Sequence, residues 1–504
     1  MKKSQQLYEL IHSMSKSEKR YFKVHSTKGN SIYVQLFDLI IGQANYDNTA
    51  LKICLEKEDI KSSLARIQYH LYQLILTSLG DFQATKHPRY EVLNAIQQYI
   101  ILRDRGLHDQ GRQLLQSALK TAQQYNYYGL TLEIYDLMED WVTEEASYDK
   151  ALKQKKILEK SIREHQNYTN SVLHLKEQIY ALRLFFLKHN FARTTAHKAF
   201  LLQFLSNNEA ALAQEKNSLK RRLLLTILIY VHYGLQDYKQ LLSTEKKRLE
   251  LLKNAAFNAH ISPFLVYAYH RNLLWILLRN KDYKAHQLFV QKMRTNPYWK
   301  VGFTSTFYTI KLDLAEKVTQ LYACVEQGHY LPAYHQVNDL WGLYQQTTKY
   351  WDTNLFVNTL ILFMNTTFCL GKYEETIDWL QLLEQEVPSA HLLPYRNMGK
   401  IAHLLIHEAL GDDKYIQNVL ESTRIRLYRK HDFFEVASLF LKFFKKKSHQ
   451  KQGADQALLL EYKEKMEAVA QQEGQKGFFI LFNFVDWFDS KLQKTTIANL
   501  NRKF

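Results

Sequence analysis

The chain is poor in the residues that make tight turns. Its 504 residues contain only 16 glycines and 6 prolines. A protein of many short strands needs turn residues at the end of each strand, so this composition argues against an all-β fold. Residues that favour helices, such as Leu, Gln, Lys, Glu and Ala, are abundant, and 46% of the chain is hydrophobic. The composition predicts an all-α protein with a large buried core.

The sequence has few cysteines and no recognisable export signal. The three cysteines lie far apart and form no CxxC pair, so they cannot build a disulfide framework. Glu9 and His12 interrupt what would be the apolar centre of a secretion signal. The longest apolar run, from Leu223 to Tyr233, is shorter than the roughly 20 residues that cross a bilayer. We therefore expect a cytoplasmic protein with no membrane span.

Common catalytic motifs are missing. The chain has no GxxxxGK[ST], GxGxxG, GxSxG or HExxH pattern. His403 and His407 are four residues apart and can face one metal from a helix, but 20 histidines make such a pair ordinary. His431 and Asp432, with Asp486 downstream, faintly resemble the H…HD…D pattern of helical metal-dependent phosphohydrolases. We predict no enzyme activity, no metal and no cofactor.

Basic residues outnumber acidic ones by 67 − 50 = 17. Such a surplus attracts nucleic acid, acidic proteins or anionic lipid surfaces. It is concentrated near the two ends, where the candidate contact residues are Lys16, Lys19, Arg20, Lys23, Lys445, Lys446 and Lys447. A solvated surface that keeps the protein soluble is the simpler interpretation.

One short segment has the pattern of a turn followed by a helix. In "GKYEETIDWLQLLEQEVP", which begins at Gly371, the aromatic Tyr373 is followed by Ile377, Leu380 and Leu383. Spacings of four, three and three place these side chains on one helix face. Gly371 can adopt the left-handed conformation that ends the preceding helix. The segment therefore predicts the second helix of a helical hairpin.

The same pattern, a Gly or Asn shortly before an aromatic that opens an amphipathic run, recurs along the chain. The aromatic residues are Phe191, Tyr238, Tyr283, Tyr330, Tyr373 and Tyr415, and Tyr148 is a weaker member that lacks the glycine. Together with a weaker member near His108, they are separated by 40, 43, 47, 45, 47, 43 and 42 residues. A fixed period of this length is typical of stacked helical hairpins. We expect these aromatics to pack between hairpins and not to contact a ligand.

The segment "LGKYEETIDWLQLLEQEVP" resembles the tetratricopeptide repeat (TPR) superfamily. The resemblance covers residues 90 to about 440, although the period of about 44 exceeds that family's 34 and the strict consensus is absent. It implies a TPR-like α-solenoid, a right-handed superhelix whose concave groove binds peptides and protein partners.

The two ends do not share the period. Residues 1–85 predict a helical bundle that caps the array and carries a basic leader, with Ser15 and Glu18 spaced as a capping box. A small bundle beside a basic helix also fits a DNA-reading head, although no clear helix-turn-helix signature is present. Residues 455–504 predict C-terminal capping helices around an apolar helix.

An asparagine stripe is the candidate binding site. Asn354, Asn358 and Asn365 lie within about 40° on one helix face, and Tyr350 precedes them in register. Side-chain amides both donate and accept hydrogen bonds, which suits an extended peptide backbone. A polar outer face or a set of inter-helix hydrogen bonds is the simpler alternative.

The favoured function is a non-enzymatic scaffold or adaptor that binds a protein or peptide in its groove. The alternative is a regulatory or nucleic-acid-binding protein with a basic N-terminal helical head and a helical-repeat half that senses a peptide or protein. The oligomeric state stays open.

Overall fold

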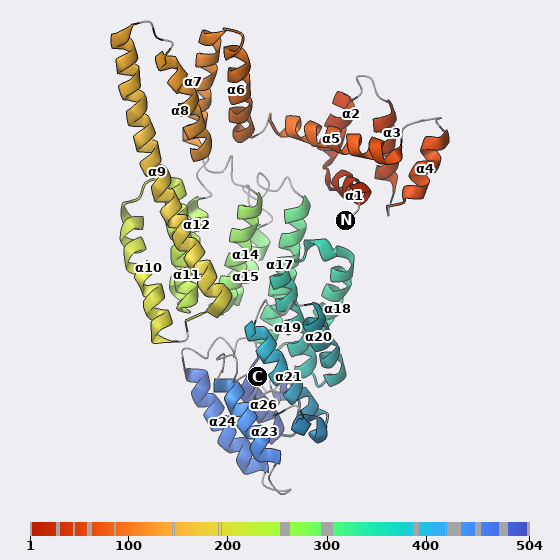
Figure 1. Cartoon of the computed structure of the whole chain (residues 1–504). Coiled ribbons are helices and arrows are strands. Elements are labelled where there is room, and N and C mark those ends of the chain that lie inside the picture. The colour runs from red at the N-terminus through yellow and green to blue at the C-terminus, as the bar shows by residue number, and fades with distance from the viewer. Residues whose placement is uncertain are drawn as a thin grey trace.

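The fold is all-α in every part of the chain that can be described. The computed structural model describes residues 3–26, 31–43, 46–57, 63–84, 87–143, 145, 147–189, 191–192, 194–251, 263–293, 306–386, 393–418, 420, 435–448, 455–472 and 482–500. These ranges hold 24 helices and no strand, and neighbouring helices stack on one another in chain order (Figure 1).

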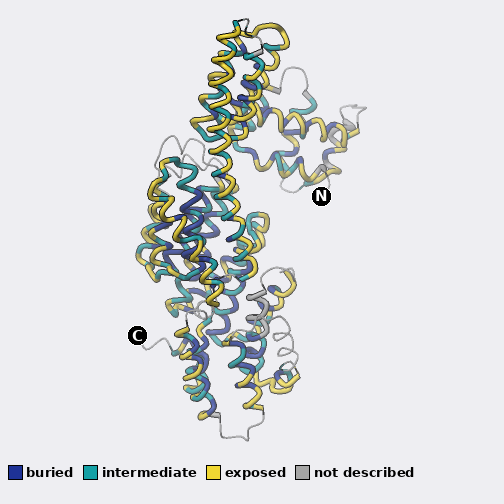
Figure 2. The backbone as a smooth tube through the Cα atoms, turned by 60° about the vertical axis from the view of Figure 1, so that its left-hand side comes forward, coloured by how far each residue is buried: buried dark blue, intermediate teal, exposed yellow. Residues whose placement is uncertain are grey.

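The first five helices form a separate small bundle. They are α1 (Lys3–Ser13), α2 (Lys16–Ser26), α3 (Ser31–Gly42), α4 (Asn48–Lys57) and α5 (Leu64–Ala84). Their core has no exposed surface at Phe22 and Phe37, whose rings lie 4.6 Å apart. The predicted capping box at the start of α2 is confirmed, because Ser15 N–H donates to Glu18 Oε2 at 2.8 Å and Glu18 N–H donates to Ser15 Oγ at 3.3 Å. Figures 1 and 2 show this bundle projecting to one side of the remaining helices.

The next seven helices contain one unusually long member. They are α6 (Pro88–Arg103), α7 (His108–Gln124), α8 (Tyr128–Thr143), α9 (Tyr148–His189), α10 (Thr195–Gln214), α11 (Ser218–Gly234) and α12 (Tyr238–Glu250). α9 is 42 residues long and packs against α8 as well as against α11. It therefore runs continuously between the α6–α8 group and the α10–α12 group (Figure 1).

Helical hairpins follow from residue 263 onward. They are built from α14 (Pro263–Arg279), α15 (Tyr283–Met293), α17 (Thr306–Glu326), α18 (Tyr330–Thr347), the short 3-10 helix η2 (Thr348–Tyr350), α19 (Thr353–Cys369), α20 (Tyr373–Glu386) and α21 (Leu393–Ala409). We call α14, α17 and α19 the first helices, and α15, α18 and α20 the second helices. The first helices pack directly on one another. α18 contacts α17 and α19, α20 contacts α19 and α21, and α18 also meets α20, where the Trp341 and Trp379 ring centroids lie 5.0 Å apart. The largest core runs through this region and into the C-terminal helices.

The C-terminal helices close around aromatic side chains. They are α23 (Glu435–Ser448), α24 (Asp455–Gln471), α26 (Phe484–Leu492) and α27 (Ile497–Leu500). Phe484, Trp487 and Phe488 are almost completely buried, so α26 is covered on several faces by α23 and α24. Phe368 of α19 contacts Phe482 with ring centroids 5.4 Å apart, which joins these helices to the preceding hairpins.

A single type of turn connects many of the helices. At Gly371, whose φ is +79°, Lys372 N–H donates to the Thr367 carbonyl at 2.9 Å. This is the bond of a Schellman motif, which satisfies a carbonyl at the end of a helix. The same bond accompanies a residue of positive φ in seven other turns, at Gly106, Asn126, Gln236, Lys281, Gly328, Gly411 and Lys494. Backbone geometry is therefore repeated even where the residue type is not.

Most of the predicted bend aromatics lie where a helix begins. Tyr238, Tyr283, Tyr330 and Tyr373 are each the first residue of the helix that follows the turn. Tyr330 is 7% exposed, and the other three pack partly buried against apolar cores. Tyr415 is half-buried, and its ring stacks on His407 with centroids 3.6 Å apart.

The packing prediction is wrong for Tyr148. Its side chain is 78% exposed, because α9 begins there and continues as one helix where the interval predicted a hairpin. Phe191 follows the end of α9 and is 7% exposed. Gly234, the glycine of the next predicted turn, is helical, and a Cβ there would lie 2.6 Å from Leu201 Cδ1 and 3.0 Å from Phe186 Cζ. That glycine permits the close approach of α11 to α9 and α10.

Replacing Gly371 with alanine is expected to lower the free energy of unfolding by about 1–2 kcal/mol, because a Cβ is unfavourable at positive φ. The added Cβ would also lie 3.1 Å from Thr496 Cγ2. Gly342→Ala inside α18 is the matched control, since nothing lies within 4 Å of a Cβ there and alanine favours a helix. Thermal unfolding of both variants checks this, and equal melting temperatures would contradict it.

Candidate partner-binding surface

The asparagines occupy the least buried stripe of a helix that is otherwise enclosed. In α19, twelve of seventeen residues are buried, whereas Asn354 is exposed and Asn358 and Asn365 are half-buried. Asp352 fixes the start of the helix, because its Oδ1 accepts from Leu355 N–H at 3.0 Å. Asn358 Nδ2 donates to the Asn354 carbonyl at 2.8 Å. The three amides therefore share one accessible face of a first helix.

Tyr350 is not part of that helix. It is the last residue of η2, and α19 begins three residues later at Thr353. Its ring packs on Phe307 of α17 with centroids 5.4 Å apart. The predicted helical register between Tyr350 and Asn354 therefore does not apply, although Tyr350 lies only two residues before the helix cap.

A cluster of aromatic and basic side chains adjoins the stripe at the start of the first helices. Lys311 Nζ of α17 lies 3.2 Å from Asp352 Oδ2 and 5.6 Å from the ring centroid of Tyr267 in α14. Arg271 stands over the same ring, with Cζ 5.4 Å from its centroid. We call Tyr267, Arg271, Phe307, Lys311 and Asp352 the aromatic–cation cluster. Cation–π contacts of this kind contribute about 0.5–2 kcal/mol each.

Burial sets the electrostatics of the aromatic–cation cluster. Tyr267 is 1% exposed, and burial raises the pKa of its phenol, which Arg271 opposes. Asp352 keeps about a third of its side chain exposed beside the more buried Lys311. The phenol thus stays neutral beside two cations.

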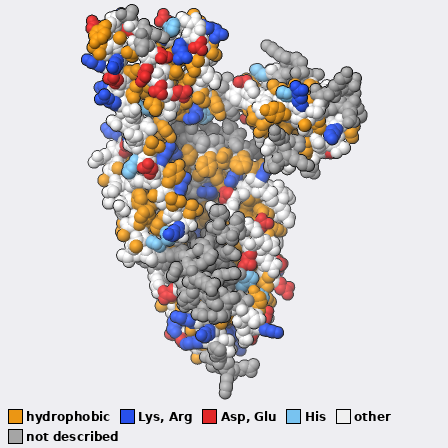
Figure 3. Space-filling model, viewed as in Figure 1, with side chains coloured by type: hydrophobic (Ala, Val, Ile, Leu, Met, Phe, Trp, Pro, Cys, Tyr) orange, Lys and Arg blue, Asp and Glu red, His pale blue; other side chains and the backbone are white. Residues whose placement is uncertain are grey.

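The asparagine stripe and the aromatic–cation cluster together offer aromatic faces, amides and cations. Figure 3 shows hydrophobic side chains with basic ones among them over the upper parts of α14 and α17. Phe264 and Phe307 are 53% and 40% exposed there. Aromatic faces, amides and cations together suit an extended peptide, whose backbone carbonyls accept hydrogen bonds.

The N-terminal basic residues lie on α2. Lys16 and Arg20 are exposed, whereas Lys19 and Lys23 are half-buried. Lys23 Nζ pairs with Asp38 Oδ1 of α3 at 2.5 Å. Two of these four cations, Lys16 and Arg20, are therefore exposed, and Lys23 pairs with an acid of its own bundle.

The C-terminal basic residues are more fully paired. Lys446 Nζ lies 3.1 Å from Glu461 Oε1, and Lys447 Nζ lies 2.8 Å from Glu408 Oε1. Lys445 is exposed in the last turn of α23. Two of the three lysines thus join α23 to α24 and to α21, which reduces the positive charge that this end offers to phosphates.

The two histidines of the weak metal pattern face different acids. His403 Nε2 lies 3.5 Å from Glu384 Oε1, and His407 Nδ1 lies 3.4 Å from Asp412 Oδ2. Within the described residues no group of three or more His, Cys, Asp or Glu side chains is placed to hold a metal ion. His431 and Asp432 lie outside the described residues.

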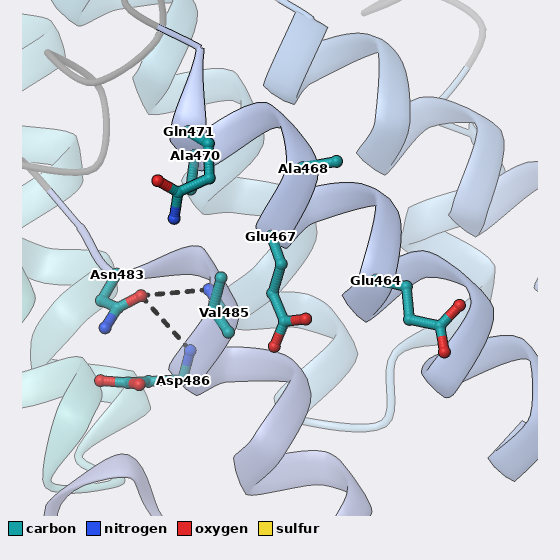
Figure 4. Close-up of a pocket in the computed structure, with 8 residues that line it drawn as sticks. All are labelled: Glu464, Glu467, Ala468, Ala470, Gln471, Asn483, Val485 and Asp486. Atoms are coloured by element: carbon teal, nitrogen blue, oxygen red, sulfur yellow. Dashed lines mark hydrogen bonds between the residues drawn. The ribbon is translucent and has the colours of Figure 1, made fainter.

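A hollow of about 690 Å³ lies between α24 and α26 (Figure 4). Glu464, Glu467 and Asp486 line it together with Asn483, whose Oδ1 accepts from Val485 N–H at 3.2 Å and so caps α26. Burial raises the pKa of the Asp486 carboxyl, and Asp489 adds to the rise. The hollow is open and acidic, so it repels phosphates.

Comparison with family models, curated proteins and solved structures gave no match to this chain. A search of the described residues for a helix long and apolar enough to span a membrane found none. Sequence periodicity located the asparagines but missed the aromatic–cation cluster, whose members Tyr267, Lys311 and Asp352 come from segments about 40 residues apart.

Proposed function

We propose that the chain is a non-enzymatic scaffold or adaptor, a TPR-like α-solenoid that binds a protein or peptide partner along its first helices. The observation that carries this is the close backbone packing of α14 on α17 and of α17 on α19, whereas α18 and α20 meet through large side chains such as Trp341 and Trp379. When one layer of a hairpin array packs more closely than the other, the array curves toward the closer layer. The first helices would then line a concave groove.

The spacing of the turns supports a repeating unit. The left-handed residues Gln236, Lys281, Gly328, Gly371 and Gly411 follow one another at intervals of 45, 47, 43 and 40 residues. These intervals agree with the period of about 44 predicted from the aromatics. The hairpins from α11 to α21 are thus the part of the chain to which we assign the repeat.

Within the groove we assign the contact to the asparagine stripe and the neighbouring aromatic–cation cluster. Asn354 and Asn358 lie on the accessible face of a first helix, where they can hydrogen-bond a peptide backbone without reading its sequence. Phe307 and Tyr350 supply aromatic area at the end of the stripe.

The first test is recovery of the tagged full chain from its own cells, with and without nuclease. A defined protein that stays bound at about 200 mM salt after nuclease treatment supports the scaffold. Contacts to six to ten phosphates weaken by about 10³ to 10⁵ between 50 and 200 mM salt. Partners lost on nuclease treatment would overturn the proposal and direct attention to Lys16 and Arg20 of α2.

Replacing both Asn354 and Asn358 with alanine is expected to weaken binding of that partner about tenfold or more, because each lost hydrogen bond contributes about 0.5–1.5 kcal/mol. Titration calorimetry measures the change. Asn207→Ala is the control, since Asn207 is exposed on α10 and away from the stripe. Unchanged affinity in a folded double variant would remove the stripe from the site.

A further inference from the structure

An apolar stripe runs along the second half of α9. Leu173, Tyr180, Leu184 and Leu187 are 45%, 58%, 67% and 81% exposed. At 100° per residue they fall within about 60° of one another. Figure 3 shows hydrophobic side chains gathered over this part of α9. Large apolar side chains grouped in this way on a protein surface mark an interaction site more often than isolated ones do.

The stripe belongs to a helix that is firmly held. Val172, Ile179 and Leu182 on another face of α9 are almost completely buried in one core with α11 residues. Phe185 and Phe186 pack on Phe200 and Tyr230 with ring centroids 5.3 and 5.4 Å apart. α9 therefore presents the four exposed side chains on a rigid, well-packed support, which lowers the entropy cost of binding.

Charged residues of opposite sign flank the stripe on the same side. Glu177 and Lys188 both lie within about 60° of Leu173, on the side away from Arg183. The Glu177 side chain is 76% exposed, and Lys188 is also exposed. Glu177 lies 3.8 Å from His174 on its own helix, a surface contact that contributes little.

Arg183 lies on the other side of the stripe. Its Nε donates to Tyr230 Oη of α11 at 3.2 Å, and its Cζ lies 5.9 Å from the ring centroid of Tyr180. These contacts hold the guanidinium toward its own molecule. The flank with Glu177 and Lys188 is thus the one that offers both charges to an approaching surface.

We propose that this stripe binds the same stripe of a second copy of the chain, with the two α9 helices antiparallel. A two-fold axis between residues 182 and 183 places Glu177 of each copy opposite the partner's Lys188, since 177 + 188 equals 182 + 183. Leu184 and Tyr180 then lie nearest the axis. A two-fold interface must be self-complementary, and a flank that carries one acid and one base eleven residues apart meets that condition. A uniformly charged partner would leave one of the two charges unmatched.

The expected association is weak and depends on concentration. The stripe extends over about 21 Å, since a helix rises 1.5 Å per residue. Such a contact is smaller than the roughly 800 Å² per partner of a standard stable interface. Small, transient interfaces are commonly weak, so we expect dimers to form only at micromolar concentrations.

Sedimentation equilibrium of the full chain between about 1 and 100 µM tests the proposal. The wild type should shift from monomer to dimer over this range. Leu184→Glu should raise the dimer dissociation constant tenfold or more, because it buries a carboxylate between apolar side chains. Leu331→Glu is the matched control, since Leu331 is 53% exposed on α18, and it should dimerise like the wild type.

Charge reversal tests the antiparallel arrangement. Glu177→Lys and Lys188→Glu should each weaken the dimer, because each creates two like-charge contacts across the axis. The double variant, Glu177→Lys with Lys188→Glu, should restore it to within a few-fold of the wild type. A wild type that stays monomeric at about 100 µM would overturn the proposal, and so would a Leu184→Glu variant that dimerises normally or a double variant that does not recover.

Discussion

Replacing Trp487 with alanine is expected to lower the free energy of unfolding of the C-terminal helices by about 3–5 kcal/mol, because it leaves a large cavity. Trp487 is fully buried. Its ring centroid lies 5.5 Å from that of Phe440, 5.7 Å from that of Phe443 and 4.8 Å from that of Phe488. No single neighbour can move into the space without abandoning its own contacts.

Hydrogen exchange measures this loss where it occurs. A chain of 504 residues with several separate cores need not unfold in one step, so protection of the α23, α24 and α26 amides is the appropriate quantity. Leu460→Ala is the control, because Leu460 is 47% exposed on α24 and should change stability by less than about 0.5 kcal/mol. Equal protection in the two variants would contradict the assigned role of Trp487.

Replacing Arg248 with methionine is expected to lower the free energy of unfolding by about 3–5 kcal/mol, because it leaves a buried carboxylate without its counter-charge. Glu245 is completely buried, and its Oε1 lies 2.6 Å from the Arg248 guanidinium. The guanidinium also stands 4.1 Å from the ring centroid of Tyr269 on α14. The pair therefore joins two turns of α12 and an aromatic of α14.

The pH dependence and a second substitution identify the cause. Burial raises the pKa of Glu245 above the ordinary 4.5, and Arg248 opposes that rise. The folded state therefore holds this proton more tightly than the unfolded state, and stability falls as pH rises above that ordinary value. Without Arg248 the pKa rises further, so the loss should be small near pH 4 and grow toward neutral pH.

Urea unfolding at several pH values, followed by the α11–α14 amides, gives this profile. Adding Glu245→Leu to Arg248→Met should recover most of the stability, since the buried charge is then gone. A loss that does not change with pH, or a double variant as unstable as Arg248→Met, would show that packing and not charge is responsible.

Local sequence signals predicted the all-α class and the starts of four helices. The aromatics Tyr238, Tyr283, Tyr330 and Tyr373 stand at helix starts because each follows a turn that ends the preceding helix. Glycine marks only part of these turns, since Gln236 and Lys281 adopt positive φ elsewhere. The Schellman hydrogen bond stabilises the turn whatever the side chain, so residue type alone is an incomplete guide.

The failure at Tyr148 also has a physical reason. From Tyr148 to His189 the sequence contains neither glycine nor proline, so nothing interrupts helix formation where a bend was predicted. The spacing between aromatics did not reveal that residues 148–189 form one continuous helix. The absence of turn residues was the signal that could have corrected it.

Short-range and long-range features of the candidate site differ in how far sequence predicts them. The asparagine stripe is a property of one helix, so its periodicity is visible in the sequence. The aromatic–cation cluster depends on which residues of α14 and α17 meet the cap at Asp352. No local sequence pattern encodes those contacts. They arise because α14, α17 and α19, which are separated along the chain by other helices, pack together in the folded protein.

Because α9 is long, a small tilt at one of its ends would move its other end by several ångströms. Forty-two helical residues extend about 63 Å, and helices of this length bend only gently. α9 packs on α8 as well as on α11. A tilt of about 5° where it meets α11 would move its far end by about 5 Å. Such a tilt at the α10–α11 end would therefore displace the α6–α8 helices without any change within them.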